Sequence, residues 1–472
     1  MVADPTFHRA TVQPAADDAR DPAAPEADPA GAAAGDLPRG RKGRSGAWQV
    51  AGVAGRGAPR AMDAARWPVT GPAADGAAAR TRVALLNSAD PRGLKVGGIE
   101  TYTRDYLELH PDDIEILFVG PDEIGDLQPG RVNDVLFRGR RIGFLPLFRL
   151  DDSTNRYPDT IAGSETFRFA RCLWRNRGLL RGVLRDGGYS AEVRRPEYAP
   201  ILWWLGVPVF TMVHLWGDGT KPQSGILARR PWLRTATEFA AAAVSEKFYS
   251  VNPDYTARYA KRYRPFAARF DTLTTWANTR MFRPLPFRRD GPLRLVFAGR
   301  TDAFKRLDIM LAVVARLRAA GHAVEFHFVG DGDLAAVEGH GPVADCVVTH
   351  GRCDAAGVAG IIGGADIGLL TSEFEGMPRF AIECVASGRP VVALHLPQLE
   401  AMFATGHAGT LVARGPDQVA ALAEAILALQ ARIRAGETAP ETVAVAAESH
   451  RPERLLGRIW DAHRGLAARR SF

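Results

Sequence analysis

Residues 371–393 constrain the fold of this chain more than any other stretch. Two acids in it, Glu375 and Glu383, stand eight positions apart. Gly376 and Pro378 indicate a turn directly after the first acid, and the apolar residues that follow recur at helical spacing. An apolar run after the helix predicts a buried strand. We therefore expect an acid in a loop, a helix that opens beside it, and a second acid along that helix.

Such a site suits a ligand that carries both phosphate and hydroxyl groups. A helix N-terminus has free N–H groups and the positive end of the helix dipole, so it attracts phosphate. Carboxylates accept hydrogen bonds from sugar hydroxyls. A nucleotide-sugar has both kinds of group. The alternative is a surface acid followed by an ordinary amphipathic helix; the order of glycine, proline, helix and strand favours the ligand site.

Apolar runs alternate with helical patterns through the C-terminal half. This alternation predicts a parallel sheet with helices on both faces, which is an α/β domain. Gly388 is expected to end the helix that carries Glu383. The strands are expected at residues 293–298, 324–329, 347–350, 365–370 and 390–393, with a helix at 307–319.

Two candidate site elements follow strands of the first half. A strand at residues 82–87 precedes a loop with Gly97 and Gly98 and then a helix, an order that suits phosphate. A strand at residues 208–213 ends directly before His214. Ligands of open α/β sheets bind at the carboxyl ends of strands. His214 is therefore a candidate site residue, with a structural histidine as the open alternative.

The segment from residue 121 to 195 has the weakest pattern. Short strands are expected at 135–137 and 142–145, and a helix at 167–184. The arginines of this helix form either a solvated face, which we favour, or a basic surface toward an acceptor or a membrane. They are Arg168, Arg171, Arg175, Arg177 and Arg181, with Arg185 just beyond.

An uncharged run at residues 198–217 has the length of a membrane-spanning helix. Two prolines and a glycine interrupt it, so we expect a helix end at 199–205, a turn, and then the strand before His214. Further on, residues 241–245 predict a short buried strand, and residues 248–263 predict a helix.

The composition narrows the function classes. The 472 residues are enough for two or three domains. The net charge of +7 suits an anionic substrate or an anionic membrane surface, or it has no specific meaning. No run of five basic residues occurs, so no nucleic-acid partner is expected. The four cysteines form no C-x-x-C pair, which predicts buried thiols in a reducing cytoplasm and no zinc site. The N-terminus lacks the pattern of a signal peptide.

Residues 371–393 resemble the signature of retaining glycosyltransferases of GT-B family 4, the glycosyl transferases group 1 type. That signature is an acid, Gly-x-Pro, a second acid eight positions after the first, and a helix of small residues that leads to Gly-x-Pro-Val-Val. Residues 97–100, Gly-Gly-Ile-Glu, and 330–332, Gly-Asp-Gly, resemble family loops at the same places. The resemblance implies two Rossmann-like domains with parallel sheets that face a central cleft.

The resemblance also implies roles for the matching residues. Glu375 would bind hydroxyls of the transferred sugar, and Glu383 those of the ribose. Arg300 and Lys305 match the family's cationic pair for the diphosphate, so no metal or other cofactor is expected. The remaining implied contacts are Gly376 and Met377 to the diphosphate, Gly351 and Arg352 to the base, Gly97 and Gly98 over the phosphates, and His214 near the sugar. The Asp-x-Asp at residues 331–333 is interpreted as a turn.

Three departures from the family pattern stand out. Arg379 occupies a position that is commonly apolar, which alters the expected donor pocket. Ala277 replaces the proline of the usual Pro-Asn before the linker. Glu400 matches a family acid, but the two glycines that often precede it are missing.

The expected activity is transfer of a sugar, with retention, from a nucleotide-sugar to a glycan or lipid-linked acceptor. Same-face attack would need no protein nucleophile, and the sequence offers no clear one. The expected location is the cytoplasm, at the inner face of the membrane if a peripheral contact forms. A GT-B sugar-nucleotide epimerase and a non-catalytic GT-B scaffold stay open as alternatives.

Four segments are expected along the chain. Residues 1–79 contain no isoleucine and one leucine, so they cannot bury enough apolar surface to fold. The resemblance also implies that the last helix crosses back onto the first domain, with Ile459 and Trp460 as its packing face. The segments are a disordered Ala/Pro/Arg-rich extension at 1–79, an acceptor-side Rossmann-like domain at 80–285, a nucleotide-sugar-binding Rossmann-like domain at 291–435, and C-terminal helices at 436–472.

Overall fold

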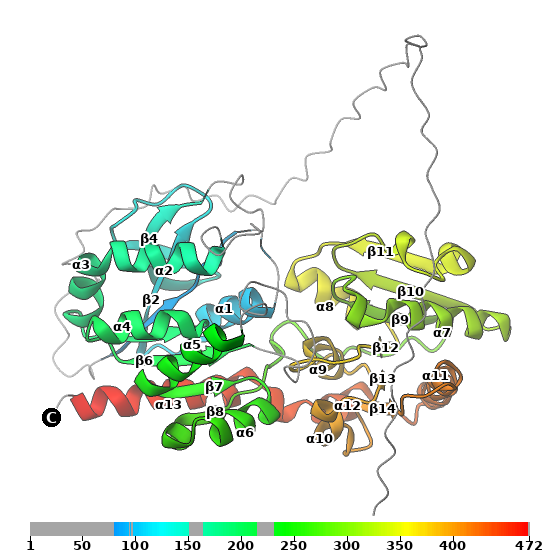
Figure 1. The fold of residues 1–472 in the computed structure, drawn as a ribbon. Helices are drawn as coiled ribbons and strands as arrows, with labels where there is room; N and C mark the ends of the chain where they lie inside the picture. The colour runs from blue at the N-terminus through cyan, green and yellow to red at the C-terminus, as the bar shows by residue number, and fades with distance from the viewer. Residues whose placement is uncertain (1–79, 94, 96–97, 151–163, 215–230, 471–472) are drawn as a thin grey trace, which may run out of the picture. The chain divides into compact units, whose positions relative to one another are not determined.

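The structure is a computed structural model, and it describes residues 80–93, 95, 98–150, 164–214 and 231–470. Two β-sheets organise these residues (Figure 1). Every strand pairing in them is parallel except that of β3 with β4, which form a hairpin. The predicted α/β architecture with two parallel-sheet halves is therefore confirmed.

The first sheet has the strand order β3-β4-β2-β1-β5-β6-β7-β8. Its strands are β1 (Thr81–Leu86), β2 (Ile114–Asp122), β3 (Asn133–Phe137), β4 (Arg140–Arg149), β5 (Ser190–Val193), β6 (Val209–Val213), β7 (Ser245–Ser250) and β8 (Phe270–Thr272). Its helices are α1 (Gly98–Leu109), α2 (Glu165–Arg175), α3 (Arg177–Leu180), α4 (Ala199–Trp204), α5 (Pro231–Val244) and α6 (Pro253–Arg262).

Helices cover both faces of this sheet, because alternate residues of its buried strands point to opposite sides. Ala84 and Leu86 of β1 pack into one core with α2, α4 and α5, which lie side by side (Figure 1). Val83 and Leu85 pack into a second core with α1 and the last helix, α13 (Pro452–Arg470). Each face therefore has its own apolar core.

The second sheet has the order β11-β10-β9-β12-β13-β14. Its strands are β9 (Leu293–Ala298), β10 (Val324–Val329), β11 (Val347–Gly351), β12 (Ile367–Leu370), β13 (Val391–Leu394) and β14 (Gly409–Val412). Its helices are α7 (Leu307–Ala319), α8 (Ala355–Gly364), α9 (Arg379–Ala386), α10 (Glu400–Phe403) and α11 (Gln418–Ala435), and α12 (Pro440–Val445) packs on α9. As predicted, α9 ends just before Gly388, whose φ of 73° suits glycine.

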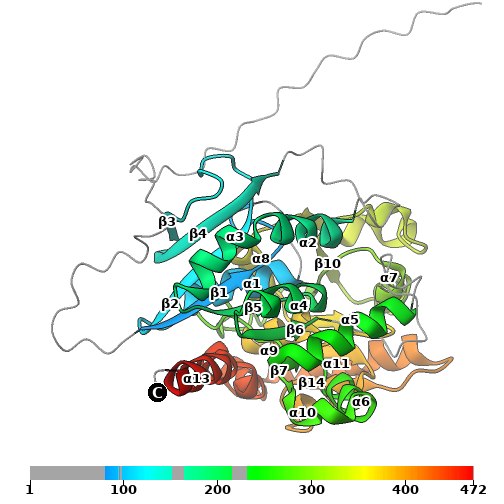
Figure 2. The same ribbon diagram turned by 60° about the vertical axis from the view of Figure 1, so that its left-hand side comes forward.

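The last helix packs on the first sheet, as the family resemblance implies. Ile459 and Trp460 of α13 join the core that contains α1. Figure 2 shows α13 along one side of the first sheet. His463 of the same helix is fully buried: its Nδ1 lies 2.7 Å from Ser190 Oγ and its Nε2 3.5 Å from Glu192 Oε2. Glu192 also pairs with Arg194, which is itself buried. A chain of buried polar groups thus joins α13 to β5.

Two secondary-structure predictions are wrong. Residues 241–244 end α5 instead of forming a strand, and residues 245–250 form β7 instead of starting a helix. Alanine is the strongest helix former, so the alanine run extends the preceding helix. The aromatic residues Phe248 and Tyr249 favour a strand. In contrast, the predicted order of helix, turn and strand before His214 is confirmed by α4 and β6. No helix in the described part of the chain is long and apolar enough to cross a bilayer.

Candidate active site

The parallel pairing of β9 with β12 brings Lys305 and Glu375 together. Both residues lie in loops that follow these neighbouring strands, so the loops leave the sheet at the same edge. Lys305 Nζ forms an ion pair with Glu375 Oε1, and Ser372 Oγ donates to the same oxygen over 2.8 Å. The Lys305 and Glu375 side chains are 17% and 13% exposed. Two residues predicted to bind phosphate and sugar thus meet at the carboxyl ends of the strands.

Hydrogen bonds between the two loops fix this meeting point. Thr371 Oγ1 lies 2.9 Å from the Lys305 carbonyl and 2.8 Å from the Arg306 carbonyl. The Glu373 amide donates to the Phe304 carbonyl over 2.8 Å. The loop after β12 is therefore held along the loop after β9, and the positions of Lys305 and Glu375 do not depend on their own ion pair alone.

Arg300 stands apart from that pair. Its guanidinium binds Asp302 over 2.6 Å, and its side chain is 65% exposed. It lies in the same loop as Lys305, but no contact joins it to Lys305 or Glu375 among the described residues. The structure therefore places one of the two predicted cations beside Glu375 and leaves the other at the surface.

Gly351 and Arg352 lie at the end of β11, at the edge of the sheet. The Gly351 carbonyl accepts a hydrogen bond from the Gly330 amide over 2.9 Å. Arg352 Nε donates to Asp331 Oδ1 over 3.0 Å. Asp333 Oδ1 accepts from the Ala335 amide over 3.0 Å. Asp333 is thus used within the turn, and Asp331 binds Arg352 after the neighbouring strand. In the described ranges no three His, Cys, Asp or Glu side chains gather as a metal-binding group.

Glu383 is buried and already has a cationic partner. Arg379 Nε donates to Glu383 Oε1 over 2.6 Å, and Arg379 Nη2 donates to Asp105 Oδ2 over 2.8 Å. The same Asp105 carboxylate accepts from Trp276 Nε1 over 3.0 Å and from Asn278 Nδ2 over 3.3 Å. We call Asp105, Arg379 and Glu383 the Arg379 bridge. The bridge joins α9 to α1. It also engages the carboxylate of Glu383, which was predicted to bind ribose.

Burial is the largest influence on the pKa values of Glu383 and Arg379. It raises the pKa of the Glu383 carboxyl, and the nearby Arg379 guanidinium opposes that rise. Burial also acts to lower the pKa of Arg379, but the carboxylates of Glu383 and Asp105 outweigh this effect and raise it. Arg379 therefore stays charged, and it is the group that keeps a negative charge on buried Glu383 tolerable.

Gly376 and Met377 lie in the turn between Glu375 and α9. The Gly376 carbonyl accepts a hydrogen bond of 3.0 Å from Asn252 Nδ2, a buried side chain that also caps α6. Met377 packs against the apolar core of the second sheet. The turn is therefore anchored on one side by a polar contact to the first half of the chain and on the other by apolar packing.

His214 follows β6 directly and packs edge-on against Tyr102, with 5.0 Å between ring centroids. Its Nε2 is buried and has no hydrogen-bond partner among the described residues. Burial, together with the nearby charges of Arg194 and Arg195, lowers its pKa to about 3. His214 is therefore neutral at physiological pH, which excludes a role as a permanent cation at the site.

The loop after β1 is held by an arginine that the sequence analysis did not single out. Arg104 Nε donates to the Pro91 carbonyl over 2.8 Å, and its Nη2 donates to the Gly93 and Lys95 carbonyls over 2.7 and 2.8 Å. Gly98 begins α1 and a side chain there would meet only open space. Gly97 lies outside the described residues.

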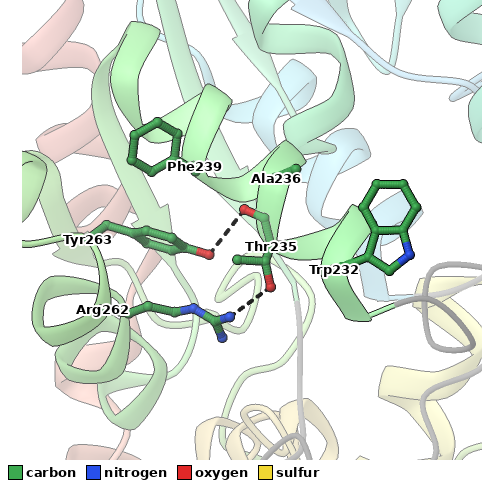
Figure 3. A pocket seen from close by; sticks show the side chains of 6 residues that line it. All are labelled: Trp232, Thr235, Ala236, Phe239, Arg262 and Tyr263. Carbon is green, nitrogen blue, oxygen red and sulfur yellow. Dashed lines mark hydrogen bonds between the residues drawn. The ribbon is translucent and has the colours of Figure 1, made fainter.

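A separate pocket of about 610 Å³ lies between α5 and α6 and contains none of the predicted site residues (Figure 3). Arg262 donates to Thr235 Oγ1 over 2.7 Å, and Tyr263 OH donates to the Thr235 carbonyl over 3.4 Å across it. Its lining is mainly apolar, from Trp232, Ala236 and Phe239. Its position away from Lys305 and Glu375 argues against a role in binding the predicted donor.

Sequence reasoning missed Ser372, Asp105 and Arg104. The role of Ser372 could have been predicted, because it lies three residues before Glu375 in the same loop. Asp105 and Arg104 lie on a helix where charged residues are common, and only tertiary structure shows that their partners are Arg379 and three loop carbonyls.

These sheets and loops define a GT-B fold, and comparison with known proteins agrees. Residues 292–432 match the family model described as Glycosyl transferases group 1. This match runs from β9 into α11 and includes Arg300, Lys305, Glu375 and Glu383. The resemblance of residues 371–393 to the glycosyl transferases group 1 type is therefore confirmed.

Individual relatives support the same fold. A D-inositol 3-phosphate glycosyltransferase from Stackebrandtia nassauensis is 32% identical over 203 residues, 39% of this chain and 45% of that protein, so the match spans less than half of that relative. Sucrose-phosphate synthase from Thermosynechococcus elongatus superposes with a TM-score of 0.62 at 18% identity, over 82% of this chain and 100% of the other. Anabaena HepE in complex with UDP and glucose superposes with a TM-score of 0.55 at 13% identity, over 81% of this chain and 99% of the other.

Proposed function

We propose that this chain is a retaining, metal-independent glycosyltransferase of the GT4 type. It would move a sugar from a nucleotide-sugar to a glycan or lipid-linked acceptor in polysaccharide or glycoconjugate biosynthesis. The observation that carries the proposal is the pairing of Lys305 with Glu375 at the carboxyl ends of β9 and β12. The match of residues 292–432 to Glycosyl transferases group 1 and the UDP complex of a GT-B neighbour support it.

The ion pair suggests how a donor would be received. A diphosphate offers Lys305 a doubly anionic partner in place of one carboxylate, so its ammonium would move to the phosphate and bind the charge that develops on the leaving group. Glu375, still held by Ser372, would then accept hydrogen bonds from sugar hydroxyls. Arg300, exposed beside the same loop, would add a second cation by reorienting away from Asp302.

The ribose contact predicted for Glu383 would need a shared carboxylate. One of its oxygens accepts from Arg379, so a ribose hydroxyl would bind the other oxygen or displace the guanidinium. Gly376 and Met377 would present backbone N–H groups to the diphosphate, and Gly351 and Arg352 would border the base, as the resemblance implies. His214 would contact the sugar as a neutral imidazole.

Two substitutions test the proposal. Lys305→Met and Glu375→Gln should each lower the rate of nucleotide release from the accepted nucleotide-sugar by about 10²–10³-fold, because each removes a polar contact to the reacting group. Lys261→Met and Glu338→Gln, which change exposed residues elsewhere, serve as matched controls.

The assay uses the full chain with a panel of UDP-, GDP- and other nucleotide-sugars, with and without glycan and lipid-linked acceptors. Donor-dependent transfer that fails in the two site variants but not in the controls would support the proposal. An epimerised sugar-nucleotide formed without an acceptor would select the epimerase, and absence of binding to every donor would select the scaffold. Inversion at the transferred carbon, or a requirement for a divalent metal, would contradict the retaining, metal-independent form.

A further inference from the structure

Exposed tryptophans and arginines gather on the helix layer formed by α2 and α4. Trp174 on α2 and Trp204 on α4 lie in ring contact, with centroids 5.0 Å apart. They remain 46% and 55% exposed, and the adjacent Trp203 is 58% exposed. Tryptophan usually buries most of its large apolar ring. Three neighbouring tryptophans about half exposed therefore mark a surface that is incomplete in the isolated chain.

Arginines frame these rings. Arg171 lies one helical turn before Trp174, and the Arg177 guanidinium stacks over the Trp174 ring at 5.6 Å from its centroid. Arg185 lies against Gly206, close after Trp204 in the sequence: a Cβ added at Gly206 would meet the Arg185 side chain at 3.2 Å. We call Arg171, Trp174, Arg177, Arg185, Trp203 and Trp204 the tryptophan–arginine patch.

The charges of the patch have no acidic partners within the part of the chain that the structure describes. Arg171, Arg177 and Arg185 are exposed, and none of them lies in an ion pair with a described carboxylate. Other exposed arginines are paired, such as Arg352 with Asp331 and Arg451 with Glu448. The patch thus carries positive charge that is not balanced locally, and an anionic partner would supply the balance.

We propose that the tryptophan–arginine patch binds the surface of an anionic phospholipid bilayer. Tryptophan is the side chain most suited to the headgroup region, because its ring is apolar and its N–H polar. Exposed arginines attract anionic headgroups, and Arg binds phosphate with two parallel hydrogen bonds. Neither of the two described pockets includes a patch residue, so a small ligand is a poorer match than an extended surface.

Membrane binding is a property separate from the proposed glycosyltransferase activity, and it can be measured with vesicles in the absence of any donor. The full chain is sedimented with neutral phosphatidylcholine vesicles and with vesicles that also contain phosphatidylglycerol. Binding is expected only to the anionic vesicles and should weaken as salt is raised. The triple variant Arg171→Glu, Arg177→Glu, Arg185→Glu should lower the partition coefficient by at least about 100-fold.

A second variant and a control distinguish binding through the patch from attraction by the net charge of the chain. Trp174→Ala with Trp204→Ala should reduce binding at least tenfold at unchanged net charge. The control variant Arg283→Glu, Arg288→Glu, Arg432→Glu makes the same charge change at exposed arginines, two between β8 and β9 and one on α11. It should bind nearly as well as the parent chain. All variants change exposed side chains, and circular dichroism checks their folding.

Three outcomes would overturn the proposal. The parent chain could fail to bind anionic vesicles, or the patch variants could bind like the parent, which would assign binding to another segment. Alternatively, the patch variants could abolish self-association or capture of an acidic protein without any effect on vesicles, which would make the patch a protein interface.

Discussion

The Arg379 bridge allows a quantitative test of how the two halves of the chain are joined. Arg379 is mostly buried and contacts two carboxylates, Glu383 at 2.6 Å and Asp105 at 2.8 Å. Arg379→Met keeps much of the side-chain volume but leaves both buried acids without a cation. Loss of one partner from a buried ion pair costs about 3–5 kcal/mol. In urea unfolding followed by circular dichroism, this corresponds to a midpoint lowered by about 1–2 M.

The matched control is Arg458→Met. Arg458 of α13 pairs with Asp271 over 2.7 Å, but its side chain is 46% exposed, so its loss should cost no more than about 1 kcal/mol. The triple variant Arg379→Met, Glu383→Gln, Asp105→Asn should regain most of the lost stability, because no uncompensated charge is left. If Arg379→Met shifts the midpoint no more than Arg458→Met does, the bridge contributes little and this reasoning is wrong.

The pH dependence of the same variant follows from the sign of the Glu383 shift. A carboxyl whose folded-state pKa is raised stabilises the fold below its unfolded pKa of about 4.3 and loses that contribution as pH rises through the folded value. Without Arg379 the rise in pKa should be larger. The deficit of Arg379→Met relative to the parent chain should therefore narrow as pH falls from neutrality toward about 4.3.

Two further predictions concern the backbone and the histidines. Gly330→Ala should destabilise the fold strongly, because φ of Gly330 is 154° and the new Cβ would lie 1.8 Å from the Gly299 carbonyl oxygen. In Gly360→Ala, on α8, the new Cβ meets open space, so this variant should stabilise the fold by up to about 1 kcal/mol. Thermal unfolding of the two variants and the parent chain measures both effects. Burial lowers the pKa of His110 to about 4 and that of His214 to about 3, below the unfolded value of about 6.5. Each histidine should therefore cost about 1.4 kcal/mol per unit as pH falls below about 6.5, until its folded pKa is reached. Substitution of both by Gln should flatten the acid limb of a stability–pH curve, and an unchanged limb would contradict the assignment.

Much of the second sheet was predictable because its strands are short apolar runs separated by clear helical patterns. The predicted helix at 307–319 is α7, and the acid, turn, helix and strand of residues 371–393 follow as expected. The family resemblance assigned Lys305 and Glu375 to one donor site, but it did not predict their ion pair. Periodicity does not show which strands are neighbours, so the pairing of β9 with β12 could not be read from the sequence.

The features that the sequence did not predict lack a distinctive local sequence signal. The alanines of residues 241–244 suit a buried strand and a buried helix equally by periodicity, and helix propensity decided the outcome. Arg379 was singled out as a departure, but its use could not be foreseen, because Asp105 lies 274 residues earlier in the chain. Long-range polar contacts of this kind depend on the fold as a whole.

The return of α13 to the first sheet has a consequence for how the chain is made. Ser190 on β5 meets His463 across a sequence separation of 273 residues. During synthesis, the strands of the first sheet leave the ribosome well before the helix that covers one of their faces. Until α13 is complete, Glu192 lacks its contact with His463. The apolar residues of the first sheet that pack against Trp460 also lack their cover. We therefore expect the half of the protein that is translated first to be the last to reach its native state.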